Sequence, residues 1–257
     1  MSVLRLEGIT RRFGGLVALN EVSLTIPGQG LSAVIGPNGA GKTTLFNVIS
    51  GFMSPSEGRV HFGGADITGL PPETIASRGL IRTFQLVQLF EDLTVLENVK
   101  VGCHLHTRGG FLAALLPTRA ARAEEAAVDT EARRLLDETG LGAQTETLAA
   151  VLPYGQKRLL EITRALAAKP KLLLLDEPAA GLNRQETDTL AVLLRSIVAR
   201  GTAVLLIEHD MSLVMQVADN IAVLDFGRLI ATGSPDEVRR NPDVIAAYLG
   251  TDEAAHV

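Results

Sequence analysis

The first third of the chain alternates apolar and polar residues with the period of a half-buried strand. The alternation is present in residues 3–9 and is more regular in residues 20–26. A third stretch of this kind, residues 59–67, contains the pair Gly63-Gly64, which is typical of a tight hairpin turn. We therefore predict a strand-rich N-terminal third that is antiparallel at its edge.

The pattern then changes to short apolar runs. Residues 31–35, 172–175 and 203–207 are predominantly or wholly apolar. Runs of this length suit strands that are buried on both faces of a parallel sheet. Between the last two runs, residues 186–200 carry apolar side chains at helical spacing. Strands of this kind that alternate with helices predict an α/β core.

Residues 94–170 are predominantly helical in pattern, and their middle is rich in alanine, arginine and glutamate. This pattern predicts a helical subdomain inserted into the α/β core. Two short helices are expected in the tail, the first of them starting at Ser234-Pro235-Asp236. We expect one domain over residues 1–250, followed by a tail at 251–257. Within the domain, an α/β core with an antiparallel β-subdomain would occupy about 1–90 and 160–232. The helical subdomain would occupy about 91–159, and C-terminal helices about 233–250.

Composition narrows the functional classes. The 257 residues include 46% hydrophobic and 21% charged residues, which excludes a wholly disordered chain. The single cysteine, Cys103, excludes an internal disulfide framework. A net charge of −5 and only 4% aromatic residues argue against a nucleic-acid partner. The sequence shows neither a membrane-spanning apolar segment nor a secretory signal, so a cytoplasmic location is expected.

A phosphate-binding loop is predicted between the strand at 31–35 and the helix that follows it. Residues 36–43, Gly-Pro-Asn-Gly-Ala-Gly-Lys-Thr, match the P-loop pattern. Glycines allow successive main-chain N–H groups to face the phosphates, and the helix start adds a partial positive charge. Lys42 would reach the β- and γ-phosphates, and the Thr43 hydroxyl would bind Mg²⁺. The expected nucleotide-binding residues here are Asn38, Gly39, Ala40, Gly41, Lys42, Thr43 and Thr44.

Acidic residues follow the apolar run at 172–175. Asp176 and Glu177 would lie at the carboxyl end of that strand, where open α/β sheets bind their ligands. Asp176 is placed to hold Mg²⁺, and Glu177 is placed to orient or deprotonate an attacking water. His209 ends the next apolar run and is expected to contact the γ-phosphate. Gln85, by itself, carries little information.

The segment Leu152-Pro153-Tyr154-Gly155-Gln156 resembles the signature loop of ABC ATPases, usually L-S-G-G-Q. With this match the whole chain falls into the order of motifs of that family. The resemblance implies a P-loop NTPase fold, with ATP and Mg²⁺ as cofactors. It implies that Phe13 stacks on adenine and that Gln85, in the Q-loop, takes part in catalysis and in Mg²⁺ binding. It also implies a D-loop at residues 180–183 and a switch role for His209. It also implies that Tyr154, Gly155 and Gln156 contact the ATP held by a second ATPase subunit.

Several segments are similar to one branch of the family, the longer ATPase subunit of branched-chain amino acid importers. These segments are residues 13–19, 82–85, 152–156, 176–183, 208–211 and 247–250. The resemblance implies a subunit that powers import of branched-chain or related amino acids. Its partners would be ABC permease transmembrane subunits, a second ATPase subunit in a homo- or heterodimer and, indirectly, a solute-binding protein. It would be peripheral on the cytoplasmic face of the inner membrane. Leu86, Leu89 and Phe90 would offer apolar anchors to the permease or, as the alternative, pack in the core of the chain itself.

Three positions depart from the general family pattern. Pro153 stands where most relatives have serine, Tyr154 replaces a glycine and Asn183 replaces an aspartate. One alternative function is an ATPase of another transporter, such as a lipid or lipopolysaccharide exporter, whose signature usually keeps serine and two glycines. A soluble ABC ATPase of DNA repair or translation is the other alternative. Repair types need a long coiled coil and translation types need a second P-loop, and the sequence shows neither.

Overall fold

The computed structural model describes residues 2–103 and 119–254, and these fall into two compact units. The first unit comprises Met1–Arg82, Lys171–Ala180 and Thr187–Val257, and the second comprises Thr83–Pro170 and Gly181–Glu186. Their boundaries lie at 82/83 and 170/171, whereas we expected boundaries near 90 and 160. The difference follows from the helix at Tyr154–Ala167, which packs as a whole on the helices of the second unit.

An antiparallel sheet forms one layer of the first unit. Within the described residues it has four strands in the order β2-β1-β4-β5. Alternate residues of β1 face the core, and they pair with apolar residues of both neighbouring strands. Gly63 and Gly64 have positive φ angles and form the turn between β4 and β5, as predicted. The strands are β1 (Ser2–Phe13), β2 (Leu16–Pro27), β4 (Glu57–Phe62) and β5 (Ala65–Asp66).

The other layer is a mainly parallel sheet, with six strands in the described residues. The order is β10-β9-β3-β8-β7-β6, and only β10 is antiparallel to its neighbour. Every residue of the three predicted apolar runs is buried, which confirms that these strands are covered on both faces. The strands are β3 (Leu31–Ile35), β6 (Leu80–Arg82), β7 (Leu172–Asp176), β8 (Ala203–Ile207), β9 (Asn220–Asp225) and β10 (Arg228–Gly233).

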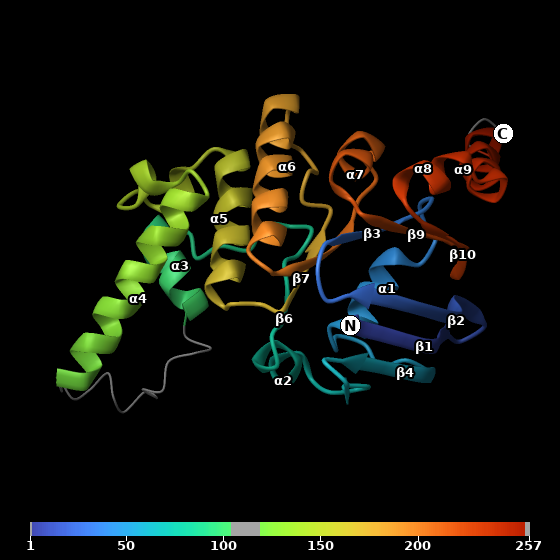
Figure 1. Ribbon diagram of the computed structural model, residues 1–257, viewed down its shortest axis with the longest axis horizontal. Helices are drawn as coiled ribbons and strands as arrows, with labels where there is room; N and C mark the ends of the chain where they lie inside the picture. Colours follow the sequence, from blue (N-terminus) through green and yellow to red (C-terminus); the bar gives the residue numbers. More distant parts are fainter. Residues whose placement is uncertain (1, 104–118, 255–257) are drawn as a thin grey trace. The chain divides into compact units, whose positions relative to one another are not determined.

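Helix α1 (Lys42–Ile49) lies between the two sheets of the first unit (Figure 1). Leu45, Phe46 and Ile49 are buried there in one core with residues of both sheets. The predicted helix at 186–200 is confirmed as α6, and the two predicted tail helices are confirmed as α8 and α9. The remaining helices that lie in or continue into this unit are α2 (Pro72–Ser77), α6 (Arg184–Ala199), α7 (Met211–Val217), α8 (Pro235–Arg240) and α9 (Pro242–Ala254).

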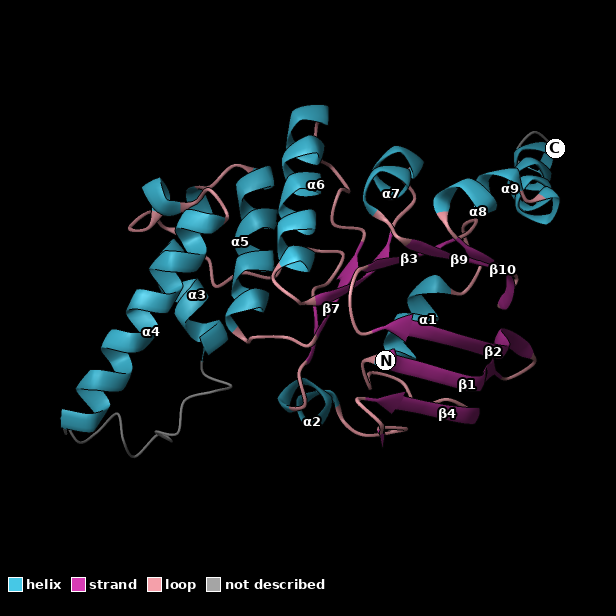
Figure 2. Cartoon of the chain, viewed as in Figure 1, coloured by secondary structure: helices cyan, strands magenta, loops and turns pink. Residues whose placement is uncertain are grey.

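The second unit is helical, as predicted (Figure 2). Helices α3 (Val95–Cys103), α4 (Arg119–Glu138) and α5 (Tyr154–Ala167) pack on one another around a core of their own. Short 3₁₀ turns at Gly142–Gln144 and Ala149–Val151 connect α4 to α5. The part of the expected helical pattern at residues 104–118, and the end of the tail at 255–257, lie outside the described residues. In the described part, no helix combines the length and the apolar character that crossing a membrane requires.

The parallel sheet should be the most sensitive part of the first unit to truncation of side chains. Replacement of Leu174, which is fully buried in β7, by alanine should lower the free energy of unfolding by about 2–5 kcal/mol. Val192→Ala on the exposed face of α6 is the matched control and should change it by less than about 0.5 kcal/mol. Urea unfolding of the full chain measures both. Equal effects of the two variants would contradict this account of the core.

A candidate nucleotide site at the carboxyl ends of the parallel strands

The P-loop joins the end of β3 to the start of α1 and is held against neighbouring main chain. A Cβ atom at Gly36 would lie 2.1 Å from the Leu224 carbonyl oxygen, and one at Gly41 would lie 2.6 Å from that of Ala18. Both glycines have positive φ angles. Gly227, in the turn after β9, donates its N–H to the Ala40 carbonyl at 3.0 Å. The loop therefore keeps its path only with glycine at these positions.

Lys42, the first residue of α1, is buried beneath this loop. Its Nζ atom donates hydrogen bonds to the Gly36 and Pro37 carbonyls at 2.7 and 2.9 Å. Burial lowers the pKa of Lys42, and the negative charges of Glu177 and Asp176 oppose this decrease. No side chain caps the first turn of α1. The main-chain N–H groups of that turn and the lysine therefore form a positively polarised cradle suited to phosphate.

Asp176 ends β7 and is paired with an arginine to which the sequence analysis assigned no role. Arg82 donates to Oδ2 of Asp176 at 2.8 Å, and both side chains are only 5% exposed. The same guanidinium donates to Asn47 Oδ1 at 2.8 Å and to Ser50 Oγ at 2.9 Å, both at the C-terminal end of α1. The ion pair thus ties β6 and β7 to the helix that starts at the P-loop.

Glu177 and His209 follow neighbouring strands and lie close together, as their positions in the sequence predicted. Glu177 has a φ of 46°, and its N–H donates to the Ile207 carbonyl at 2.9 Å. Its Oε2 atom is 3.7 Å from Nδ1 of His209, a side chain that is 61% exposed. A carboxylate and an exposed imidazole at one strand edge can together position a water molecule and a phosphate oxygen.

Glu208 is a second residue that the sequence analysis left without a role. Its side chain is fully buried and accepts hydrogen bonds from the main-chain N–H groups of Ala179, His209 and Asp210 at 2.8, 3.0 and 3.3 Å. Burial raises the pKa of Glu208, and the three donors oppose the rise. This carboxylate joins the loop after β7 to the loop after β8. It therefore fixes the main chain on both sides of the Glu177–His209 pair.

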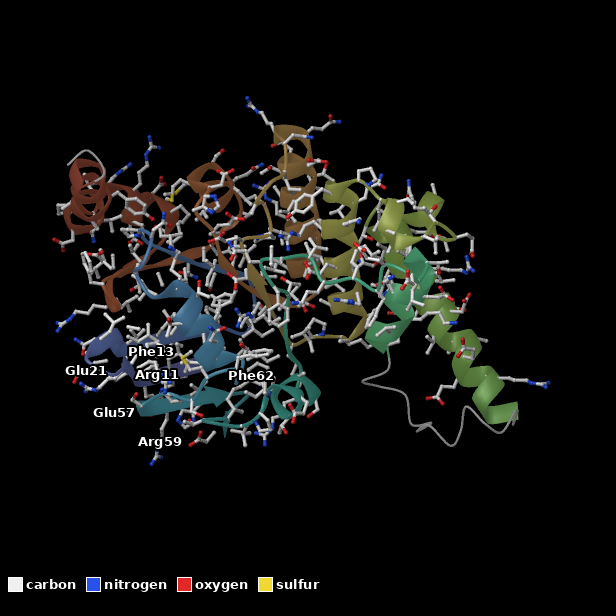
Figure 3. All side chains as sticks on the ribbon, turned by 180° about the vertical axis from the view of Figure 1, so that it is seen from behind. Arg11, Phe13, Glu21, Glu57, Arg59 and Phe62 are labelled. Atoms are coloured by element: carbon white, nitrogen blue, oxygen red, sulfur yellow. The ribbon has the colours of Figure 1, made fainter. Side chains whose placement is uncertain are left out.

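Phe13 lies at the end of β1, on the hairpin that passes the P-loop at Ala18. Its ring is 41% exposed, and the guanidinium of Arg11 lies 4.7 Å from the ring centre (Figure 3). Arg11 is held in turn by the Ser54 carbonyl at 3.0 Å. One face of Phe13 is thus covered by a cation, which leaves an aromatic surface of the kind that stacks on a planar base.

Tyr248, on α9, brings the C-terminal segment to the start of the P-loop. Burial raises the pKa of its phenol, and the main-chain N–H of Gly36, which hydrogen-bonds to the phenol oxygen, opposes the rise. Tyr248 lies in the segment 247–250, one of those that carry the family resemblance, and the sequence alone indicated no role for it. Its contact connects a terminal helix to the phosphate loop.

The other predicted site residues, Gln85, Tyr154, Gly155 and Gln156, belong to the second unit. Tyr154 is the first residue of α5, and no side chain caps that helix. Gly155 is buried, and a Cβ atom there would lie 2.3 Å from Oε1 of Glu186. The main-chain carbonyl of Gln85 accepts a hydrogen bond from Arg158 of α5 at 2.7 Å. The structure therefore brings the Gln85 and signature segments together within this unit.

Comparison with known proteins agrees with this geometry. The ABC transporter family profile matches residues 19–180. The chain belongs to the ABC transporter ATP-binding family. A second profile, that of branched-chain amino acid ATP-binding cassette transporters, matches residues 228–254, which include Tyr248.

Similar proteins cover nearly the whole of this ABC ATPase. It is 46% identical to the high-affinity branched-chain amino acid transport ATP-binding protein BraF of Pseudomonas aeruginosa, over 96% of this chain and 98% of that protein. It is 43% identical to the corresponding protein LivG of Escherichia coli K12, over the same shares. A crystal structure of an ATP-binding cassette of an ABC transporter in its ADP conformation superposes with a TM-score of 0.84. That structure is 35% identical and covers 97% of this chain and 99% of its own.

The oxygen atoms at the P-loop of this ABC ATPase suit a hard cation. Thr43 is exposed on the first turn of α1, and the hydrogen bond from Arg82 to the Asp176 carboxylate is made to Oδ2. Hydroxyl and carboxylate oxygens are the donors that Mg²⁺ prefers, so these two residues fit the group. Among the described residues, no cluster of three or more His, Cys, Asp or Glu side chains is arranged to hold a metal by itself.

The buried Arg82–Asp176 pair should be far more important for stability than an exposed ion pair. Arg82→Met would leave a buried carboxylate without its partner, so the free energy of unfolding of this ABC ATPase should fall by about 3–5 kcal/mol. Arg12→Met breaks the exposed pair with Glu57 and should cost at most about 1 kcal/mol. Urea unfolding of both variants measures the difference. Similar losses in the two variants would show that the buried pair has no special role.

Proposed function

We propose that this chain is the energy-coupling ATPase subunit of an importer for branched-chain or related amino acids. The observation that carries the proposal is the grouping of Lys42, Asp176, Glu177 and His209 at the carboxyl ends of β3, β7 and β8. Each strand contributes one kind of chemistry there: a phosphate cradle, an acidic pair and an imidazole. A phosphate cradle, a metal-binding acid and a water-positioning residue are recurring parts of sites that hydrolyse nucleoside triphosphates.

ATP would be held by its base and by its phosphates at separate points of the first unit. Adenine would stack on the open face of Phe13, which Arg11 supports from the other side. The main chain and side chains of the loop and first helical turn would hold the phosphates, with Lys42 moving from the Gly36 and Pro37 carbonyls to the β- and γ-oxygens. The residues assigned to phosphate binding are Asn38, Gly39, Ala40, Gly41, Lys42, Thr43 and Thr44.

Hydrolysis requires a water molecule in line with the γ-phosphate. Glu177 would orient this water and accept its proton, and His209, whose Nδ1 atom lies 3.7 Å from Oε2 of Glu177, would contact the γ-phosphate. Gln85 would contribute to the same site from the second unit. Mg²⁺, held by Thr43, Asp176 and Gln85, would neutralise charge on the phosphate oxygens. Glu208 would keep the loops that carry Glu177 and His209 in register.

The signature residues are assigned to a second ATP. In a head-to-tail dimer, Tyr154, Gly155 and Gln156 of one subunit would face the γ-phosphate bound by its partner. Pro153 has neither a hydroxyl nor an N–H group, and the phenol of Tyr154 lies 3.4 Å from Nη2 of Arg158 within its own unit. The uncapped N–H groups at the start of α5 would therefore make the contact. ATP would join the two subunits, and its hydrolysis would release them.

The names of the relatives support the transport assignment. BraF and LivG are described as branched-chain amino acid transport ATP-binding proteins, and the matching C-terminal profile carries the same description. We assign this chain to the cytoplasmic face of the inner membrane, bound to permease transmembrane subunits and to a second ATPase subunit. A solute-binding protein would deliver the substrate. Leu86 and Phe90 are exposed and would contact the permease, whereas Leu89 packs partly on the core of the second unit.

Glu177→Gln should separate ATP binding from hydrolysis. The amide cannot accept a proton from water, so kcat should fall by about 100-fold or more, while the Kd for ATP should change by less than about twofold. Steady-state phosphate release and equilibrium nucleotide binding measure the two quantities. Glu57→Gln, an exposed glutamate of the same unit, is the control and should retain full activity. Retention of activity by Glu177→Gln would remove Glu177 from this role.

Phe13→Ala should weaken nucleotide binding through the base alone. Loss of stacking worth about 0.5–1.5 kcal/mol should raise the Kd for ATP by about 2- to 10-fold. The Kd for inorganic triphosphate, which has no base, should stay unchanged. Phe90→Ala removes an exposed aromatic ring of the second unit and is the control. Equal weakening of ATP and triphosphate binding by Phe13→Ala would contradict the stacking assignment.

Purification of the tagged chain from its native cell in mild detergent tests the transport assignment. Mass spectrometry of the captured proteins should identify two polytopic permeases and a second ATPase subunit. Binding assays on the solute-binding protein encoded near them should show affinity for leucine, isoleucine or valine. Capture of lipid-export permeases, or of ribosomal or DNA-repair proteins alone, would overturn the importer assignment and leave the ATPase activity in place.

A further inference from the structure

Arg158 is a charged residue that is buried completely inside the second unit. It lies on α5, one turn after Tyr154, with a side chain that is 1% exposed. Its Nη1 atom donates to the Phe84 carbonyl at 2.9 Å, and its Nη2 atom donates to the Gln85 carbonyl at 2.7 Å. A planar guanidinium can bond two successive carbonyls in this way, whereas an ammonium group is a single point donor.

Glu161 completes the arrangement one turn further along α5. Its Oε2 atom accepts a hydrogen bond from Arg158 at 2.8 Å, and its Oε1 atom faces the N–H of Gln88 at 3.4 Å. Burial raises the pKa of Glu161, and the charge of Arg158 opposes the rise. Arg164, on the same helix, donates to the Gln88 carbonyl and lies over the Phe90 ring. Three charged side chains of α5 thus hold the main chain from residue 84 to residue 88.

A different arginine holds the main chain on the other side of Thr83. The boundary between the two units falls between Arg82 and Thr83. Arg82 is bonded within the first unit, to Asp176, Asn47 and Ser50. Phe84 is bonded within the second unit, to Arg158. Among the described residues, the buried Thr83 hydroxyl makes no hydrogen bond, so Thr83 is the residue between two firmly bonded segments.

We propose that the Arg158–Glu161 pair is a positioning device that fastens the Gln85 segment to α5, so that Gln85 and the signature residues 154–156 move as one body. Arg158 connects directly to both segments, because its Nη2 atom also lies 3.4 Å from the Tyr154 hydroxyl. The proposal rests on the function proposed above for Gln85 and the signature. It adds that a change at Gln85 is transmitted to the signature loop through Arg158.

Arg158→Lys is the direct test, performed on the purified full chain. Lysine keeps the charge opposite Glu161 but cannot bond both carbonyls. Amide hydrogen exchange measured by mass spectrometry should become at least 10-fold faster in residues 84–88 and stay unchanged in α3. The kcat for ATP should fall at least 10-fold, with a KM change of less than twofold. Unchanged exchange in residues 84–88 would overturn the proposal, whatever the ATPase result.

Two further variants separate positioning from a purely structural role. Arg158→Met combined with Glu161→Leu replaces the buried pair by apolar side chains of similar size, which restores stability in other proteins. The double variant should unfold at the same midpoint as the native chain, while amide exchange in residues 84–88 stays fast and kcat stays low. Native values for the unfolding midpoint, the exchange rate and kcat together would show that the pair only fills the core. Arg134→Met, which breaks exposed ion pairs on α4, is the control and should change none of the readouts.

The exchange experiment does not depend on catalysis. If the native chain hydrolyses no ATP under any condition, the proposed function fails, yet the exchange of residues 84–88 still reports whether Arg158 holds them. If the native chain is active and exchange is insensitive to Arg158→Lys, the proposed function stands and the positioning role is wrong.

Discussion

The close approach of the P-loop to neighbouring main chain determines where the other groups of the site within the first unit must lie. Gly36 and Gly41 pass within contact distance of the Leu224 and Ala18 carbonyls, which belong to two different sheets. No side chain fits between these segments, so the loop is located by backbone contacts. The base platform at Phe13 extends from the same strand pair as Ala18, and Asp176, Glu177 and His209 follow strands on the other side of β3. The geometry of the site is thus a consequence of sheet order.

Each unit contains a buried ion pair that holds distant segments together. A buried ion pair is costly to form and is strongly destabilising when only one partner is removed. The first unit places Arg82 and Asp176 in such a pair, and the second unit does the same with Arg158 and Glu161. Each arginine also bonds segments that are far apart in the sequence. Thr83 lies in the chain between Arg82 and Phe84, which these two networks hold, and its own buried hydroxyl makes no hydrogen bond.

The strands and the catalytic loops could be predicted because their information is local. An unbroken apolar run such as residues 203–207 has no other stable place than the inside of a sheet, and an acid directly after it must reach the sheet edge. The buried arginines could not be predicted in this way. Arg158 follows Lys157 on a helix with a polar face, where charge predicts exposure. The carbonyls that Arg158 bonds lie 73 and 74 residues away in the sequence. Arg82 and its partner Asp176 are separated by 94 residues.

The signature loop combines a motif that is local in the sequence with contacts between residues that are far apart in it. Tyr154 carries a phenol hydroxyl where the general family pattern has a glycine. In the structure this hydroxyl lies beside Arg158, and the ring edge packs on Gly181, where a Cβ atom would be 3.1 Å away. Gly155 has no space for a side chain against Glu186, whose other oxygen accepts the Asn183 N–H at 2.9 Å. Tyr154 therefore connects the signature to the D-loop segment and to Arg158, and the main-chain N–H groups at the start of α5 carry no side-chain cap. Pro153 at the N-cap of α5 contributes neither a hydroxyl nor an N–H group, and the contacts that hold this loop are made by Tyr154, Gly155 and Glu186 instead.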